Sequence, residues 1–393
     1  MMKPEESSHT ERKIRSQRVL LIAHKFLPQP DDDLVLYLNN NKVEDVMHIT
    51  HAFSDSPNRK SKCKWYKKGI LYKDWGSRDY KKLPEVFIYL KEFLFTISCA
   101  MKAKLVWDRS ICVDGLCTFF GLSLRVFGKT KKVIYWAIDF VPENRFKSNL
   151  KNHFYNFFNK FGCKNADEMW DLSPRMAEAR EKFLGVKESS YKKHKIVSYG
   201  VWLDRIKKYC FEECDKNSLV FMGHLLEKQG VQLVIRAIPE IIKKIPDFRF
   251  KVIGTGKYET ELKQISKDLE VDNYVLFLGK IEKTEDLENE IARSCVAIAP
   301  YISKLDAWTK YADPGKIKTY LACGVPVLLT DVSWNAREIE KKNCGKILLE
   351  NVGSITDGVV EMVGENVNRV FRDNAKEYAK VFDYGKIFGQ LDL

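Results

Sequence analysis

Short apolar runs alternate with longer helical segments along most of the chain. Residues 18–23 and 325–329 are nearly continuous apolar runs, which are typical of strands covered on both faces. Helices are predicted between such runs, for example over residues 231–242. This alternation predicts an α/β protein built from doubly wound domains with parallel sheets.

Polar residues follow the predicted strands of the N-terminal half. Residues 104–107 lead into Asp108 and Arg109, and residues 132–137 lead to Asp139. Because ligands bind beyond the carboxyl ends of strands in an open parallel sheet, these three side chains are expected to face a cleft. The first strand leads through a loop to aspartates at 31–33, which we expect to cap the next helix.

Glycines follow two predicted strands of the C-terminal half. The strand at 217–222 leads to Gly223, and the strand at 250–253 leads to Gly254-Thr-Gly256. The second motif alone is weak, because short glycine turns are widespread and no full dinucleotide-binding fingerprint is present. Further strands are predicted at 274–280 and 296–300, with an acidic helix between them.

The stretch from 311 to 331 reads as a loop, a helix and a buried strand. Asp313 is expected to cap the helix, Pro314 fits its first position, and Gly315 leaves the backbone accessible. Lys316 then lies in the first turn, where a cation opposes the helix dipole. Free N–H groups beside an ammonium group suit a phosphate. The alternative is a purely structural capped helix.

Asp313-Pro-Gly-Lys316, together with residues 322–327 (ACGVPV), resembles the donor-site segment of retaining GT-B glycosyltransferases of family 4. The resemblance implies two Rossmann-like doubly wound domains that face a cleft. It covers residues 218–347 strongly and the N-terminal half in outline only. The expected division is a flexible tail at 1–17, an acceptor domain at 18–200, a donor domain at 201–365, and a closing segment at 366–393 that crosses back to the N-terminal domain.

The resemblance also implies which residues bind the nucleotide-sugar donor. His224 stands where the family usually has arginine, and Lys228 lies one position before the usual lysine. Tyr311 and Thr319 occupy the positions of two family glutamates, so ribose binding by a carboxylate is not expected. The donor-binding candidates are Gly223, His224, Lys228, Gly254, Gly256, Lys280, Asp313, Pro314, Gly315, Lys316 and Thr319.

Catalysis is expected to stabilise the departing diphosphate by fixed N–H groups and cations, without a metal ion or cofactor. The catalytic candidates are Lys228, Lys316 and Asp139, the last by orienting the acceptor hydroxyl. A turn-capping role for Asp139 is the alternative. Asp31, Asp108, Arg109 and Asp139 are the acceptor-binding candidates, with a helix-capping role open for Asp31.

The implied activity is transfer of a sugar from a UDP-, GDP- or ADP-sugar to an acceptor hydroxyl with retention. A nucleotide-sugar epimerase and an inactive binding subunit of the same fold are the alternatives. An epimerase would need carboxylates or histidines beside one sugar carbon. An inactive subunit would have an empty donor pocket.

Charge is distributed unevenly along the 393 residues. Residues 1–200 carry 37 Lys and Arg against 23 Asp and Glu, a net charge of +14, whereas residues 201–393 carry 29 against 30. In the basic half, lysines alternate with aromatic residues at 62–68 and 147–164. The second segment predicts an amphipathic helix that either lies on an anionic membrane or packs its phenylalanines on the core. No nucleic-acid-binding module is recognisable.

No secretory signal is predicted in the charged segment 1–17, and no metal site is expected from the cysteines. We therefore expect a cytoplasmic protein, associated peripherally with the inner face of a membrane if the basic half binds lipid. Its acceptor is then expected to be a glycan or a lipid-linked sugar.

Overall fold

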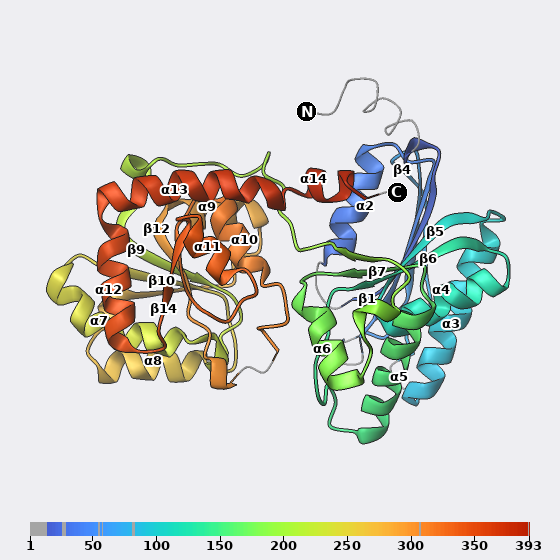
Figure 1. The fold of residues 1–393 in the computed structure, drawn as a ribbon, viewed down its shortest axis with the longest axis horizontal. Helices are drawn as coiled ribbons and strands as arrows, with labels where there is room; N and C mark the ends of the chain where they lie inside the picture. The colour runs from blue at the N-terminus through green and yellow to red at the C-terminus, as the bar shows by residue number, and fades with distance from the viewer. Residues whose placement is uncertain are drawn as a thin grey trace. The chain divides into compact units, whose positions relative to one another are not determined.

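The computed structural model describes residues 14–25, 29–53, 56, 58–80, 83–305, 308–391 and 393. Most of the expected N-terminal tail, residues 1–13, lies outside this part of the chain. The chain forms two compact units (Figure 1). Unit 1 contains residues up to 198 together with 388–393, and unit 2 contains residues 199–387. These limits describe packing, and the functional division expected from the sequence stays a prediction.

Unit 1 is built on an eight-stranded sheet with the order β4-β3-β2-β1-β5-β6-β7-β8. Its strands are parallel except at one edge, where β3 and β4 form an antiparallel hairpin. The strands are β1 (Arg18–Lys25), β2 (Asp45–Ala52), β3 (Lys62–Lys67), β4 (Ile70–Gly76), β5 (Trp107–Val113), β6 (Thr130–Ala137), β7 (Glu168–Asp171) and β8 (His194–Ile196).

Helices cover both faces of this sheet. In Figure 1, α2 lies on one side and α3, α4 and α5 lie on the other. The aromatic ring of Phe119 on α4 contacts Phe93 on α3 and Phe161 on α5, so these three helices pack side by side. The helices are α2 (Pro30–Asn40), α3 (Glu85–Lys102), α4 (Gly115–Val126), α5 (Asn149–Asn165) and α6 (Arg175–Leu184).

Unit 2 has a six-stranded parallel sheet with the order β11-β10-β9-β12-β13-β14. This is the 3-2-1-4-5-6 order of doubly wound nucleotide-binding domains. The strands are β9 (Asp215–Met222), β10 (Arg249–Ile253), β11 (Val275–Gly279), β12 (Ser294–Ala299), β13 (Val327–Thr330) and β14 (Gly345–Leu348).

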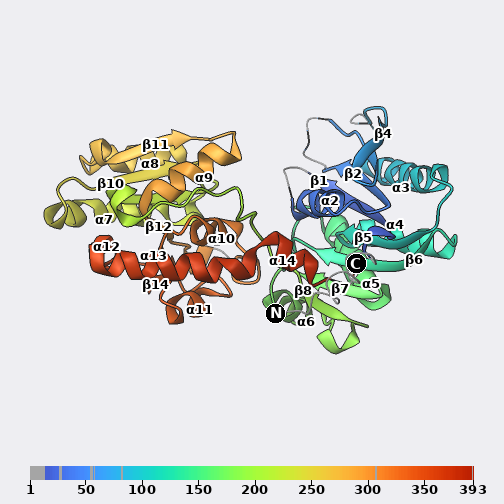
Figure 2. The same cartoon turned by 90° about the horizontal axis from the view of Figure 1, so that it is seen from above.

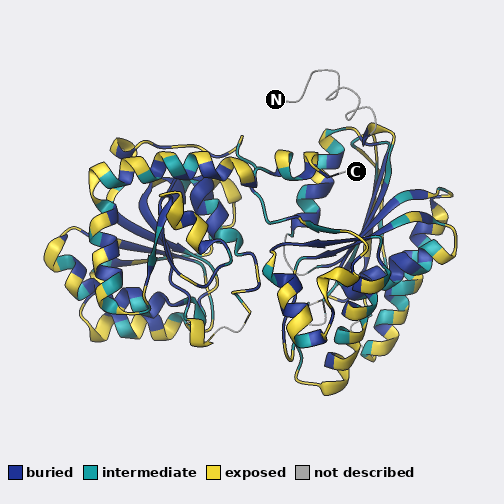
Figure 3. Cartoon of the chain, viewed as in Figure 1, coloured by how far each residue is buried: buried dark blue, intermediate teal, exposed yellow. Residues whose placement is uncertain are grey.

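Two apolar layers sandwich the sheet of unit 2, which explains the continuous apolar runs in the sequence. Successive residues of one strand enter opposite layers: Leu219 and Phe221 pack with α7, α8 and α12, whereas Val220 packs with α9, α10, α11 and α13. Figures 2 and 3 show these helices around buried strands. They are α7 (Val231–Lys244), α8 (Glu259–Asp268), α9 (Thr284–Arg293), α10 (Gly315–Ala322), α11 (Ala336–Lys341), α12 (Val352–Val363) and α13 (Glu365–Ala379).

After α13, the helix α14 (Tyr384–Gly389) contains the last residues of unit 2 and the first residues that return to unit 1. In unit 1, the Phe388 ring packs against Tyr37 and Trp136. The chain therefore ends in the core of the unit in which it began.

One strand prediction was wrong. The sequence predicted a strand at residues 104–107, but the observed strand, β5, begins at Trp107 and ends at Val113. The apolar part of this strand is residues 111–113, which follow the polar pair Asp108 and Arg109. Asp108 and Arg109 therefore lie at the start of β5, at the edge opposite to the one where ligands bind in such sheets.

Candidate functional site

Two glycine loops approach each other at the carboxyl edge of the unit 2 sheet. Gly223 follows β9, and a Cβ atom there would lie 2.7 Å from Nζ of Lys316. Gly254 follows β10, and its Cβ would lie 2.0 Å from the carbonyl oxygen of Gly223. Both have positive φ angles, 150° and 127°, which residues other than glycine rarely adopt. These glycines are required because the backbones and Lys316 leave no room.

The N-terminus of α10 faces this edge with no side chain capping it. Pro314 is the residue before the helix, the described part of the chain shows no side-chain cap hydrogen bond there, and the first turn contains no acid. The prediction that Asp313 caps this helix was wrong. Its buried carboxylate instead accepts hydrogen bonds from Nζ of Lys318, Nε1 of Trp334 and the backbone N–H of Tyr199.

Lys316 extends from the first turn of α10 toward the glycine loops. Its ammonium lies 4.2 Å from the ring centre of Phe221 and donates to Oε1 of Gln229 at 2.5 Å. Lys228, next to Gln229 in a short 3₁₀ turn before α7, lies 4.5 Å from the ring centre of Trp308. The two lysines thus reach the same region from different elements, as a site for an anion requires.

Burial and the nearby charge of Lys228 lower the pKa of Lys316 to about 7. Lys228 has the same charge, and among the residues that the structure describes no carboxylate contributes to the shift of the Lys316 pKa. A ligand phosphate would supply the missing negative charge. The buried Lys318, in contrast, has its own carboxylate in Asp313, although burial still lowers its pKa.

The other donor-site candidates are placed less uniformly. Gly256 packs against the backbone of Leu225, which holds the loop after β10 against the loop after β9. His224 is exposed, and Lys280 forms an exposed ion pair with Glu282 at 2.8 Å. Thr319 donates its hydroxyl to the carbonyl of Gly315 within α10 at 3.4 Å. Roles of these residues in donor binding stay predictions.

The acceptor candidates of unit 1 do not form one cluster. Asp31 lies in the first turn of α2 and bonds to Nε2 of His48 at 2.7 Å. Asp108 pairs with Lys131 at 2.7 Å, away from the carboxyl edge. Asp139 follows β6 and pairs with Arg145 at 2.8 Å, with half of its side chain exposed. Of these, Asp31 and Asp139 lie on the edge where a ligand is expected.

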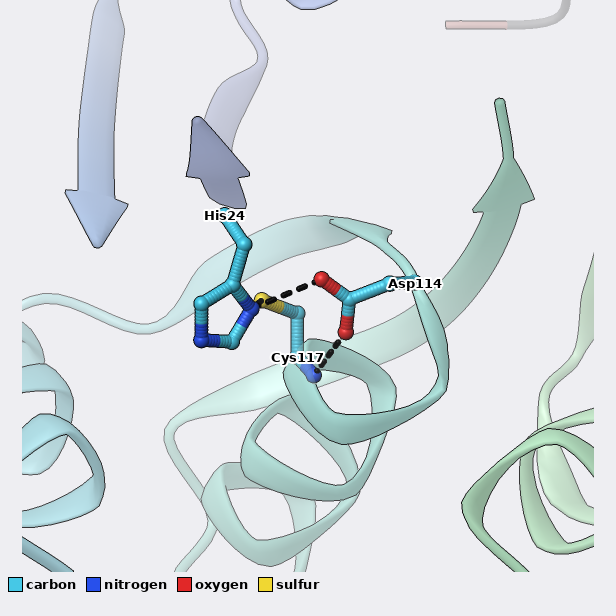
Figure 4. Close-up of side chains that lie close together, drawn as sticks. All are labelled: His24, Asp114 and Cys117. Atoms are coloured by element: carbon cyan, nitrogen blue, oxygen red, sulfur yellow. Dashed lines mark hydrogen bonds and ion pairs between the residues drawn. The ribbon is translucent and has the colours of Figure 1, made fainter. Parts of the chain in front are cut away.

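Sequence reasoning missed a cluster at the carboxyl ends of β1 and β5 (Figure 4). Nδ1 of His24 lies 2.7 Å from Oδ2 of Asp114, and its Nε2 lies 3.1 Å from Oε2 of Glu92. The other oxygen of Asp114 accepts the backbone N–H of Cys117, which caps α4. The sequence Asp114-Gly115 directly after the apolar residues 111–113 could have indicated this site, but only if the limits of β5 had been predicted correctly.

Two groups among the described residues bring together side chains of the kinds that bind metals: His24, Asp114 and Cys117, and Asp31, Asp32 and His48. Ligands of a tetrahedral zinc ion lie about 3.3 to 3.8 Å from one another, as follows from bonds of 2.0 to 2.3 Å. In the first group, His24 is nearer than this to Asp114, at 2.7 Å, and lies at the lower limit from the Cys117 sulfur, at 3.3 Å. These separations fit hydrogen bonds. In the second group, Lys25 also pairs with the aspartates.

Comparison with known families places this edge of unit 2 in context. Residues 216–365 match the family model described as glycosyl transferases group 1. A GDP-mannose-dependent monoacylated alpha-(1-6)-phosphatidylinositol monomannoside mannosyltransferase of Corynebacterium glutamicum is 28% identical over 154 residues, which are 37% of this chain and 38% of that protein. The chain spans between 38% and 61% of the length of three such relatives.

Two solved structures have the same architecture over nearly the whole chain. Sucrose-phosphate synthase from Thermosynechococcus elongatus aligns with a TM-score of 0.67 at 14% identity, over 93% of this chain and 95% of that one. WaaG, a glycosyltransferase involved in lipopolysaccharide biosynthesis, aligns with a TM-score of 0.65 at 15% identity, over 94% and 97%. The fold predicted from the sequence, two Rossmann-like units of the GT-B class, is confirmed.

Proposed function

We propose that the protein is a glycosyltransferase that takes a sugar from a nucleotide-sugar bound by unit 2. The observation that carries this proposal is the convergence of Lys316, Lys228 and the uncapped start of α10 on the glycine loops after β9 and β10. A diphosphate suits such a place, since fixed N–H groups and cations stabilise an anion there. The match of residues 216–365 to glycosyl transferases group 1 supports the same assignment.

The reaction breaks the bond between the anomeric carbon and the oxygen of the distal phosphate and forms a bond to the acceptor oxygen. The acceptor proton passes to the leaving phosphate, and the nucleoside diphosphate is released. Negative charge grows on the diphosphate as the bond breaks, so Lys316 and Lys228 would bind the transition state more strongly than the substrate. Front-side attack, with the acceptor on the face of the leaving group, gives the proposed retention.

The donor is proposed to be a hexose linked to UDP, GDP or ADP. The relative from C. glutamicum is named for its dependence on GDP-mannose, which makes GDP-mannose one of the donors to test first. Thr319 and the buried Tyr311 supply no carboxylate for the ribose. A weaker hold on the ribose is therefore part of the proposal, with the diphosphate contributing most of the binding.

The acceptor is proposed to be a glycan or a lipid-linked sugar at an anionic membrane surface. The helices α3 and α5 both pack against α4, and the ion pair of Glu85 with Lys151 joins them. Apolar side chains of both helices are exposed. Phe158 and Phe161 of α5 pack on Phe119, whereas other apolar residues face outward. The exposed ones are Val86, Phe87, Leu90, Leu94, Met101, Leu150, Phe154 and Phe157.

Lysines of the basic half would bind lipid headgroups while this apolar surface of α3 and α5 enters the interface. Within the part of the chain that the structure describes, no helix combines the length and the apolar character needed to cross a bilayer. Surface association is accordingly the form of membrane contact that we propose.

The proposed donor site is tested by thermal unfolding in the presence of UDP-glucose, UDP-N-acetylglucosamine, GDP-mannose and ADP-glucose. A donor at 100 times its dissociation constant should stabilise the fold by about 2.7 kcal/mol. The shift should disappear in a Lys316→Met variant, in which the side chain keeps its length and loses its charge. A shift that Lys316→Met leaves unchanged would place the nucleotide elsewhere.

A further inference from the structure

The carboxyl ends of three parallel strands meet in unit 1 around His24. His24 lies on β1, Phe53 follows β2, and Asp114 follows β5. The Phe53 ring centre lies 5.9 Å from that of His24 and the ring is partly exposed. The order of strands reverses between β1 and β5, and such a reversal is where open α/β sheets bind ligands.

His24 is held between two carboxylates. Its Nδ1 lies within hydrogen-bond distance of Asp114 and its Nε2 within that of Glu92, an arrangement that suits an imidazolium, which donates through both nitrogens. Burial opposes this charge, but the charge of Asp114 and its hydrogen bond favour it, and the pKa of His24 lies well above its ordinary value. Burial raises the pKa of Cys117, which keeps it a thiol. Asp114 is thus the partner that holds the proton on His24.

Asp114 differs from the other members of the cluster in its exposure. Its side chain is 30% exposed, against 8% for His24 and 4% for Glu92. It also has a φ angle of 89°, a left-handed conformation that is strained for a residue with a side chain. The His24 ion pair and the cap on α4 hold the carboxylate in this conformation. Strain of this kind at a strand-to-helix turn is a reason to examine the residue for function.

We propose that Asp114 binds the hydroxyl of a sugar acceptor, with Phe53 packing against the apolar face of the same sugar ring. This inference rests on the proposed function and assigns its acceptor site. Each carboxylate oxygen of Asp114 has a lone pair beyond the one used by His24 or Cys117. A hydroxyl of the acceptor can donate to such a lone pair, and the proposed transfer requires an acceptor hydroxyl.

Because its carboxylate is partly exposed, Asp114 can contact a ligand, which a fully buried ion pair cannot. His24 and Glu92 are positioning residues, since they orient Asp114 and reach solvent only slightly. Asp139, the acceptor-orienting candidate from the sequence, already has an ion-pair partner in Arg145. Asp114 also has a partner, but its partner is buried while its own carboxylate reaches the surface.

The matched variants are Asp114→Asn and Asp74→Asn. Asparagine caps a helix about as well as aspartate, so Asp114→Asn keeps the cap on α4 and removes the charge. Asp74 lies exposed on β4 and serves as the control for the same substitution elsewhere in the unit. Phe53→Ala is a second test, which leaves His24, Glu92 and Asp114 themselves unchanged although the Phe53 ring lies beside His24. Melting temperatures of all variants are measured first.

Binding of n-octyl glucoside, galactoside, mannoside and N-acetylglucosaminide below their micellar concentrations is followed by saturation-transfer NMR. At least one glycoside should bind wild type and the Asp74→Asn variant. Its affinity should fall about 10- to 100-fold in Asp114→Asn, the range expected when a hydrogen bond to a charged group is lost. Phe53→Ala should weaken binding of the same glycoside. Donor-induced thermal shifts should stay unchanged in Asp114→Asn and in Phe53→Ala.

Equal glycoside affinity in wild type and Asp114→Asn would overturn the inference, as would the absence of binding to all four glycosides. One zinc ion per purified chain, lost in Cys117→Ser, would show that the cluster is a metal site and would overturn it too. If no nucleotide-sugar shifts the melting temperature, the proposed function fails. If donors bind and Asp114→Asn changes nothing, only the acceptor assignment fails.

Discussion

Lys316 should make donor binding depend on pH near neutrality. Its pKa of about 7 means that the free site loses this cation as the pH rises through that value. A bound diphosphate supplies opposite charge and restores the pKa toward that of an ordinary lysine. The donor therefore binds together with a proton above pH 7, and affinity should fall as the pH increases.

The size of the effect follows from the fraction of Lys316 that carries its proton. At pH 8 about a tenth of the free enzyme has the ammonium, so binding should take up about 0.9 proton. Between pH 6 and pH 8 the dissociation constant should rise about tenfold, equivalent to about 1.4 kcal/mol. An intact nucleotide-sugar is the right probe, because its diphosphate carries no terminal phosphate that titrates in this range.

Calorimetric titration at pH 8 in Tris and in HEPES measures the proton uptake directly, since the two buffers differ in ionisation enthalpy. Lys316→Arg is the matched variant. Its guanidinium stays charged over the whole range, so its affinity should be nearly independent of pH and its binding enthalpy independent of buffer. The reasoning is refuted if wild type binds donor with the same affinity at both pH values and with no uptake of protons.

Other consequences concern single residues and surfaces. Lys228→Ala should lower transfer by roughly 2–4 kcal/mol of transition-state stabilisation in a steady-state assay, and turnover equal to wild type would remove Lys228 from the site. Asp139→Asn should reduce transfer sharply with donor affinity and melting temperature nearly unchanged; a lower melting temperature with intact turnover would make Asp139 structural. Asp313→Ala should destabilise unit 2 by about 3–5 kcal/mol in urea unfolding, because Lys318 is left buried and unpaired, and an additional Lys318→Met should recover part of the loss. Binding to vesicles with anionic lipid should weaken steeply with salt and with Leu90→Glu, whereas binding that neither changes would reject docking through α3.

The fold was largely predictable because its signals are local. Continuous apolar runs such as residues 18–23 and 218–222 occur where strands are covered on both faces, and they lie in β1 and β9. Gly223 and Gly254 were also visible as residues that follow strands. The backbone of Gly223 leaves no room for a Cβ atom at Gly254, and a Cβ atom at Gly223 would meet the side chain of Lys316.

The errors arose where local and long-range interactions compete. Asp313 has the sequence signature of a helix cap, but Trp334, 21 residues later, and the backbone of Tyr199, 114 residues earlier, bind its carboxylate instead. At β5, a polar pair at the start of a strand was read as its end. A single sequence does not reveal such partners before the chain is folded.

The cluster of His24, Glu92 and Asp114 was out of reach for the same reason. His24 is 90 residues from Asp114 and 68 from Glu92. Their meeting depends on β1 and β5 being neighbours in the sheet and on α3 packing against α4, the helix that follows β5. Sequence reasoning placed Asp108 and Arg109 at the carboxyl edge of this sheet, whereas they lie at the opposite edge, and it did not single out Asp114.

Release of nucleoside diphosphate tests the central claim most directly. Wild type and Lys316→Met are incubated with the nucleotide-sugar that gives the largest thermal shift and with an octyl glycoside acceptor, and the products are followed by mass spectrometry. The account predicts that wild type releases nucleoside diphosphate in step with glycosylated product, and that Lys316→Met is slower by about 30-fold or more, the lower end of the effect expected for a lost charge-stabilising donor. Equal rates in the two proteins, or a wild type that binds donor and forms neither product, would contradict it.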